Sequence, residues 1–461
     1  SFGYQRELDK NTVIEFRYVG NRGVGLQRQY NLNEFNTIEN GFAEEFKLAQ
    51  ANLYANIANG FASSGFAYRG VGTGTSPLPI MLSYFNPVAT SNPATAANYT
   101  AANFANSTLV AALSRNAPSI NTFSGTSFEN SAARRANGIA NGRPSNFFYV
   151  NPATASSGSF IVDNTANSWY DSGIIEVRRR LSAGLRVQAS YVWSKAQTNA
   201  FQSSSVVFSG YTQRPGGLDL ARAVQPFDLT HAFKMDATYD LPFGKGRSFF
   251  NSGGVVNALM GGWSILPTVR WQSGSPIQIG NVQLVGMTVK DLQKSVKVRK
   301  EASLVFWLPD DIILNSQRAF DISVANSTGY GTTFGGTTGV GTAPTGRFIA
   351  PAGYNNCIST FAGQCGFNNL VIYGPSFMKI DVSLAKKFNL GERRNIEIKA
   401  TALDVLNRPN FRVGGWTADI TGSGCCTSTF GQLGNGTAYQ DVSTTNDPGG
   451  RLIDLMIRFN F

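Results

Sequence analysis

The side chains that most often carry out chemistry are scarce in this chain, and their spacing argues against an enzyme. His231 is the only histidine, which argues against a Ser-His-Asp arrangement and against a histidine-rich metal site. Asp310 and Asp311 are adjacent, so their carboxylates point apart, and Pro309 predicts a turn there. The segment Gly244–Ser248 is basic but lacks the spacing of a phosphate-binding loop. We expect no catalytic residue, no cofactor and no metal.

The cysteines lie outside every segment that reads as a strand. They are Cys357, Cys365, Cys425 and Cys426. Outside the cytoplasm such residues form disulfides. We expect Cys357–Cys365 as a local clip, while Cys425 and Cys426 form a strained vicinal pair or bond to separate partners, because four cysteines allow three connectivities. A zinc site is not expected, since the spacing is wrong and no histidine is nearby.

The composition narrows the class of protein. The chain has 461 residues, a net charge of +11, 15% charged residues and 12% aromatic residues. The aromatic content argues against disorder. The sequence contains no run of about 18 apolar residues, so it predicts no membrane-spanning helix. Lysine and arginine are spread along the chain instead of gathering in one segment, so we expect no nucleic-acid partner. After these classes are excluded, the composition is that of a β-rich protein with long polar loops.

The elements that position these residues are long strands in which apolar and polar side chains alternate. The final segment alone would also suit a half-buried strand of a soluble sandwich. However, most of the strands are near ten residues long, which spans an outer membrane when the strand is tilted. We count about nine such segments, at residues 1–8, 12–20, 168–181, 185–195, 227–241, 263–272, 376–388, 395–402 and 451–461.

The alternation assigns strand residues to two faces, which we predict to meet water and lipid. His231 falls on the apolar parity near a strand end, as an interfacial residue would, and Val187 is expected in the middle of the membrane. The predicted lumen-facing residues are Glu15, Arg17, Arg186, Gln188, Lys234, Asp236, Arg270, Lys379, Asp381, Glu397, Lys399, Asp454 and Arg458. The predicted lipid-facing residues are Val187, Tyr191, Trp193, Phe233, Val269, Trp271, Ile380, Val382, Ile453, Leu455, Ile457 and Phe459.

The connections alternate in length. Short ones at 9–11, 182–184 and 391–394 and a medium one at 242–262 alternate with long ones at about 21–167, 196–226, 280–375 and 408–450. Tight periplasmic turns and large extracellular loops produce this alternation in membrane barrels. We therefore predict an all-β, antiparallel transmembrane β-barrel segment with short helices in its extracellular loops. An odd number of strands cannot close as an antiparallel barrel, so we expect the missing strands to precede Ser1.

Two helices are predicted inside the long loops. Between Glu39 and Asn59, apolar residues recur at helical spacing (Phe42, Phe46, Ala49, Leu53 and Ile57), and we expect them to pack within the loop instead of lining a ligand groove. Between Met287 and Arg299, the face opposite the apolar stripe is basic. Lipopolysaccharide phosphates or an acidic ligand would suit that face, although a solvated surface is the simpler explanation.

Several segments, in order along the whole chain, resemble the barrel of TonB-dependent outer-membrane receptors, and most closely the Oar-like, carboxypeptidase-regulatory-like group of acidobacterial type. They are Tyr18–Gly23, Arg28–Asn33, Ala189–Lys195, Phe227–His231, Tyr239–Gly246, Gly262–Trp263 with Ser273–Pro276, Leu403–Phe411 and the terminal Phe461. The resemblance implies a bacterial outer-membrane location and a barrel of about 22 strands around an N-terminal plug, with ligand import driven through TonB. The chain is similar to the C-terminal part only, because no plug is present.

The leading hypothesis is therefore the C-terminal barrel portion of such a receptor, for an unidentified ligand. Its lumen residues would hold water and pair with the plug, and Phe461 would end the strand that the barrel-assembly machinery recognises. The expected partners are the lipid bilayer, lipopolysaccharide, the plug with the remaining strands, and the TonB complex through that plug. A non-transporting adhesin or structural surface protein is the alternative, and a secreted carbohydrate-binding β protein is a third reading.

Overall fold

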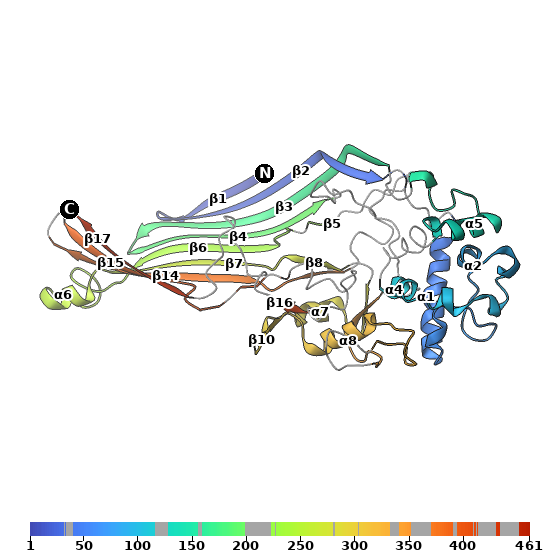
Figure 1. Cartoon of the computed structure of the whole chain (residues 1–461). Helices are drawn as coiled ribbons and strands as arrows, with labels where there is room; N and C mark the ends of the chain where they lie inside the picture. Colours follow the sequence, from blue (N-terminus) through green and yellow to red (C-terminus); the bar gives the residue numbers. More distant parts are fainter. Residues whose placement is uncertain are drawn as a thin grey trace.

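The computed structural model describes residues 1–31, 33, 40–115, 128–154, 159–198, 223–225, 227–279, 282–302, 304–331, 341–351, 370–390, 394–408, 410–411, 413, 430–433 and 451–461. Its largest element is an antiparallel sheet in which nine strands are neighbours in the order in which they occur along the chain (Figure 1). This confirms the predicted fold class and the predicted number of strands. The nine are β1 (Phe2–Asp9), β2 (Thr12–Asn31), β3 (Phe160–Ser182), β4 (Leu185–Thr198), β6 (His231–Asp240), β7 (Trp263–Gln272), β14 (Phe377–Asn389), β15 (Asn395–Leu403) and β17 (Leu452–Asn460), while β5 (Ala223–Val224) pairs with the end of β4.

Short and long connections alternate along this sheet. Tight turns join β1 to β2 and β3 to β4, five residues separate β14 from β15, and a segment with α6 (Gly254–Met260) joins β6 to β7. The long connections leave from the opposite end of the sheet, and two of them carry the other helices (Figure 1). In the β3–β4 turn, Ala183 and Gly184 have φ angles of 51° and 82°, as a type I′ turn requires. A Cβ on Gly184 would lie 2.9 Å from the carbonyl oxygen of Asp240, so the turn needs glycine there.

Three strands, β2, β3 and β6, have a boundary that differs from the prediction by more than three residues. β2 and β3 stay paired from Thr12 opposite Arg179 to Asn31 opposite Phe160, so these strands occupy both ends of the predicted loop 21–167. The alternation does not reveal this extension because register shifts on either side of Leu26 interrupt the parity. β6 starts at His231 and not at residue 227, because side-chain hydrogen bonds hold the residues before it: Asp228 accepts from the backbone N–H of Ala196, and Ser194 Oγ donates to the carbonyl group of Leu229.

The β2–β3 connection folds into a helical unit with its own core, called the first lobe (residues 40–154). The predicted helix is confirmed as α1, and its apolar stripe is buried inside the lobe, with Ile57 packed against the same cluster. The core consists largely of phenylalanine and tyrosine rings. The elements of the lobe are α1 (Phe42–Ala58), η1 (Ala62–Ser64), α2 (Pro79–Phe85), η2 (Val88–Thr90), η3 (Ala96–Asn98), α3 (Ala101–Phe104), α4 (Ser107–Arg115), α5 (Ala132–Ala140) and η6 (Pro152–Thr154).

Buried polar side chains of α1 hold the first lobe together. The Glu45 carboxylate accepts hydrogen bonds from the backbone N–H groups of Ile80 (2.7 Å) and Met81 (2.6 Å) at the start of α2. Burial raises the pKa of Glu45 to about 7, although these two donors and Arg143 favour the ionised form. Asn56 donates to two backbone carbonyl groups of the following loop. The alternation of apolar residues gave no sign of this polar side of α1.

The β7–β14 connection forms most of a second unit, called the second lobe. Its core includes Trp307 and Phe320, and Phe430 from the β15–β17 connection packs with them. Asp310 and Asp311 start a helix instead of forming the predicted turn, with Pro309 at its N-cap. The second predicted helix is shorter than expected, because residue 299 begins a strand. The elements are β8 (Pro276–Ile279), β9 (Val282–Val285), α7 (Val289–Ser295), β10 (Arg299–Glu301), β11 (Leu304–Phe306), α8 (Asp310–Phe320), β12 (Phe348–Pro351), β13 (Leu370–Tyr373) and β16 (Gln432–Leu433).

The large sheet is open. Within the described residues, β1 pairs with β2 alone and β17 pairs with β15 alone, so two strand edges have no partner from this chain. Nine antiparallel strands leave β1 and β17 running in the same direction. Among the described residues, none of the helices combines the length and the apolar character needed to cross a bilayer.

Candidate functional site

The two faces of the sheet separate the predicted side chains without exception. Residues opposite each other in neighbouring strands share a face, and this register brings all the predicted lumen-facing residues onto one side, called the polar face. One row across the sheet runs Glu15, Glu176, Ser190, Lys234, Arg270 and Lys379. All the predicted lipid-facing residues lie on the other side, called the apolar face.

Several large side chains on the apolar face are exposed in the part of the chain that the structure describes. Trp193 is 62% exposed and Ile457 is 63% exposed. His231 lies on this face, where its Nδ1 is 2.8 Å from the Tyr191 hydroxyl and its ring stacks with Trp271. The histidine is thus part of an aromatic cluster at the long-loop end of the strands. An exposed apolar surface of this extent marks contact with a partner or a membrane.

The polar face contains a recess of about 570 Å³ near the long-loop end of the sheet. Its wall includes Ser190 and Val192 from β4, Lys234 from β6, and Arg270 and Gln272 from β7, which all lie on the polar face. The rim includes the rings of Tyr170 and Phe227. The recess therefore combines hydroxyl, amide and cationic groups with aromatic surface, a composition typical of small-molecule sites.

Charges on the polar face are arranged in two different ways. On β2 and β3, Glu15, Arg17, Glu176 and Arg178 alternate in sign and form ion pairs of 2.5–3.6 Å. On β6, β7 and β14, the row Lys234–Arg270–Lys379 places three cations directly opposite one another. Like charges in directly opposite positions destabilise a sheet unless an anion lies nearby. The two regions therefore differ in electrostatic character within one face.

The acids closest to the cationic row are bound elsewhere. Asp236 and Asp381 occupy the next row on the same face, on either side of Thr268. Asp236 forms an ion pair with Arg186 at 3.6 Å, and Asp381 accepts a hydrogen bond from the backbone N–H of Asp404 at 2.8 Å. Both carboxylates therefore have partners other than the three cations of this row.

The guanidinium of Arg270 is held in place at the wall of the recess. It donates a hydrogen bond to Gln272 Oε1 at 3.2 Å and lies 5.0 Å from the centre of the Phe377 ring. Its Nε is buried and has no hydrogen-bond partner. Because this Nε has almost no accessible surface, a molecule in the recess would contact Arg270 through its other atoms.

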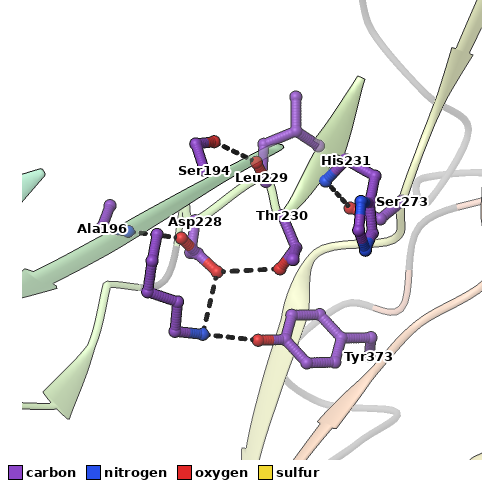
Figure 2. A network of polar contacts seen from close by, with 9 residues as sticks. Ser194, Ala196, Asp228, Leu229, Thr230, His231, Ser273 and Tyr373 are labelled. Carbon is purple, nitrogen blue, oxygen red and sulfur yellow. Dashed lines mark hydrogen bonds and ion pairs between the residues drawn. The ribbon is translucent and has the colours of Figure 1, made fainter. Parts of the chain in front are cut away.

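A polar network fixes the segment beside the recess (Figure 2). The buried Asp228 carboxylate accepts from the backbone N–H of Ala196 (2.6 Å) and from Lys195 Nζ (3.2 Å), and Lys195 also donates to the Tyr373 hydroxyl (2.7 Å). Ser194 Oγ donates to the carbonyl group of Leu229 at 2.6 Å. These contacts tie β4, the start of β6 and the β13 strand together. The strand pattern missed Asp228, although a proline two residues before an aspartate is a recognisable turn signal.

The remaining sequence-predicted features lie away from the recess. The basic face of α7 continues to Lys297 and Lys300, which line a second hollow of about 670 Å³ together with Arg408. Phe461 follows β17 and is fully exposed. The structure brings no three potential metal ligands together in the parts of the chain it describes. The predicted disulfide residues Cys357, Cys365, Cys425 and Cys426 all lie outside the described residues.

The family match agrees with this two-faced sheet. The model of a protein family described as "Outer membrane beta barrel domain" matches residues 1–441. A search of curated proteins finds no match. Among solved structures, the crystal structure of the outer membrane transporter YddB from Escherichia coli is similar at 9% sequence identity and a TM-score of 0.31, and the match covers 100% of this chain and 32% of that chain. The chain thus spans about a third of the length of that transporter.

Proposed function

The chain belongs to the outer membrane β-barrel domain family, and from that premise we propose that this outer-membrane protein is the C-terminal barrel portion of a TonB-dependent receptor. In this proposal the chain supplies part of the lumen wall and the loops that capture an unidentified ligand. The segments from Tyr18 to Phe461 that resemble Oar-like receptors support the finer assignment. Neither catalysis nor a cofactor is part of the proposal.

The observation that carries the proposal is the separation of the two faces. A soluble protein would cover the apolar face with a second layer, whereas lipid covers it in a membrane barrel. Water in the lumen would then solvate the polar face, as the ion pairs of β2 and β3 require. With this orientation, the short turns lie in the periplasm and the two lobes lie outside the cell.

The two open edges define further partners. An unpaired strand edge in lipid leaves backbone groups without hydrogen bonds, at a cost of several kcal/mol each. Closing the sheet on itself, or with a second copy in the same orientation, would pair two strands that run in the same direction. We therefore propose that an odd number of further strands, together with a plug, completes the barrel. The barrel-assembly machinery would engage β17 and Phe461, and the TonB complex would act through the plug.

A genetic experiment tests the transport proposal. The complete gene is deleted from its native bacterium, and growth is measured on a panel of single nutrients, in parallel with a strain that lacks TonB. We expect one nutrient on which both deletions slow growth equally, and on which the complete gene restores growth only when TonB is present. A surface phenotype, such as lost adhesion, that persists without TonB would favour the adhesin alternative, because both lobes are folded units at the cell surface.

A further inference from the structure

We infer that the recess on the polar face is an anion-binding site, in which Arg270 and Lys234 bind a carboxylate or phosphate group of the imported ligand. This inference rests on the proposed function, because it names the chemical class of ligand that the receptor would take. It goes beyond that function by assigning a site on the barrel wall.

Two observations meet at this place. The recess of about 570 Å³ is large enough for a small organic molecule. Two cations line it and face each other across β6 and β7, and Lys379 extends the row on β14. An anion placed against Arg270 and Lys234 would offset the repulsion between the like charges.

Arginine is suited to this role by geometry. Its guanidinium presents N–H groups in a fixed fork that matches carboxylate and phosphate oxygens. The hydrogen bond to Gln272 Oε1 and the Phe377 ring hold that fork in position before a ligand arrives. Preorganisation of this kind lowers the entropy lost on binding.

The position of the recess favours a ligand that enters from outside. Lys234 lies three residues from the long-loop end of β6, and Arg270 lies two residues from the corresponding end of β7. The rings of Tyr170 and Phe227 on the rim provide apolar surface for the uncharged part of such a ligand. A small organic acid or phosphate ester has both features.

Binding of citrate to the purified complete receptor in detergent micelles tests the inference. Titration calorimetry should show saturable binding that phosphate displaces, that glucose does not displace, and that weakens as salt is raised. The variants Arg270→Gln and Lys234→Gln should each weaken citrate binding by about tenfold or more, because each removes a charged hydrogen-bond donor. Lys399→Gln removes the same charge from the same face, away from the recess, and should bind citrate like the parent chain.

Defined outcomes would overturn the inference. These are an absence of saturable citrate binding, or equal effects of the Lys399→Gln and Lys234→Gln variants. Citrate binding by the complete receptor supports the inference. Failure of TonB-dependent growth, with citrate binding retained, would refute the transport proposal alone.

Discussion

The facing of the sheet makes a quantitative prediction for two adjacent residues. A strand rises about 3.3 Å per residue and tilts by about 40°, so each residue adds roughly 2.5 Å along the membrane normal. Val269 is on the apolar face, six residues after Trp263 and three before Gln272, so it lies about 15 Å and about 8 Å from the two ends of β7. Arginine there should cost about 2–3 kcal/mol, or roughly 30- to 150-fold in the folding equilibrium. Thr268 is on the polar face between Asp236 and Asp381, so Thr268→Arg should cost nothing measurable.

The measurement is the urea dependence of folding of the complete receptor in phosphatidylcholine vesicles. It is followed by tryptophan fluorescence and by gel mobility without heating. Val187→Arg serves as a depth control. The structure places Val187 only two residues after the start of β4 and opposite Arg179, and therefore not in the middle of the membrane as the sequence suggested. Its cost should be about 0–1 kcal/mol. Equal costs for the Val269→Arg and Thr268→Arg variants would refute the assignment of lipid to the apolar face.

The remaining predictions concern the parts outside the sheet interior. Because burial raises the pKa of Glu45 to about 7, the first lobe should lose about 3 kcal/mol of stability as pH rises from about 4.5 to about 7 and then stay constant. Hydrogen exchange at pH 5 and pH 8 measures this, and unchanged protection would contradict it; Glu45→Gln should abolish the dependence. Asp228→Asn removes the ion pair with Lys195 and should lower local stability beside the recess by about 1–2 kcal/mol, which exchange of the amides at 227–231 reports. Peptide mapping without reduction should recover Cys357 linked to Cys365, and recovery of both as free thiols would exclude the local clip.

Alternation along the strands was sufficient to predict most of the large sheet. The boundaries of β7 were predicted correctly to the residue, at Trp263 and Gln272. A strand between lipid and water has two different environments, so every second residue reports its face. For the same reason, Lys234 and Trp271 lie on the predicted faces of the sheet, opposite residues of the same predicted face in the neighbouring strands.

The recess could not be predicted in the same way. Arg270 and Lys234 are far apart in sequence, and nothing in either strand indicates that the register places them opposite each other. The extension of β2 and β3 was also missed. The paired strands β2 and β3 are too long to lie wholly within the bilayer. A part of a strand with water on both sides has no reason to alternate apolar and polar side chains. Asp228 interrupts a segment whose alternation suggested a continuous strand, because a buried carboxylate with a backbone donor outweighs strand propensity.

The distribution of buried side chains shows that the protein is built for two solvents. The largest fully buried side chains, among them Trp307, Tyr84 and Phe128, belong to the two lobes, and none of them belongs to the large sheet. The lobes therefore bury their own cores in water as soluble domains do, whereas the sheet leaves its apolar face open. Hydrophobic burial within the chain can stabilise the lobes but not the sheet. The sheet must gain its stability from a covering that the described residues do not provide, and for a sheet with this apolar face and polar reverse, the hydrocarbon of the outer membrane is that covering.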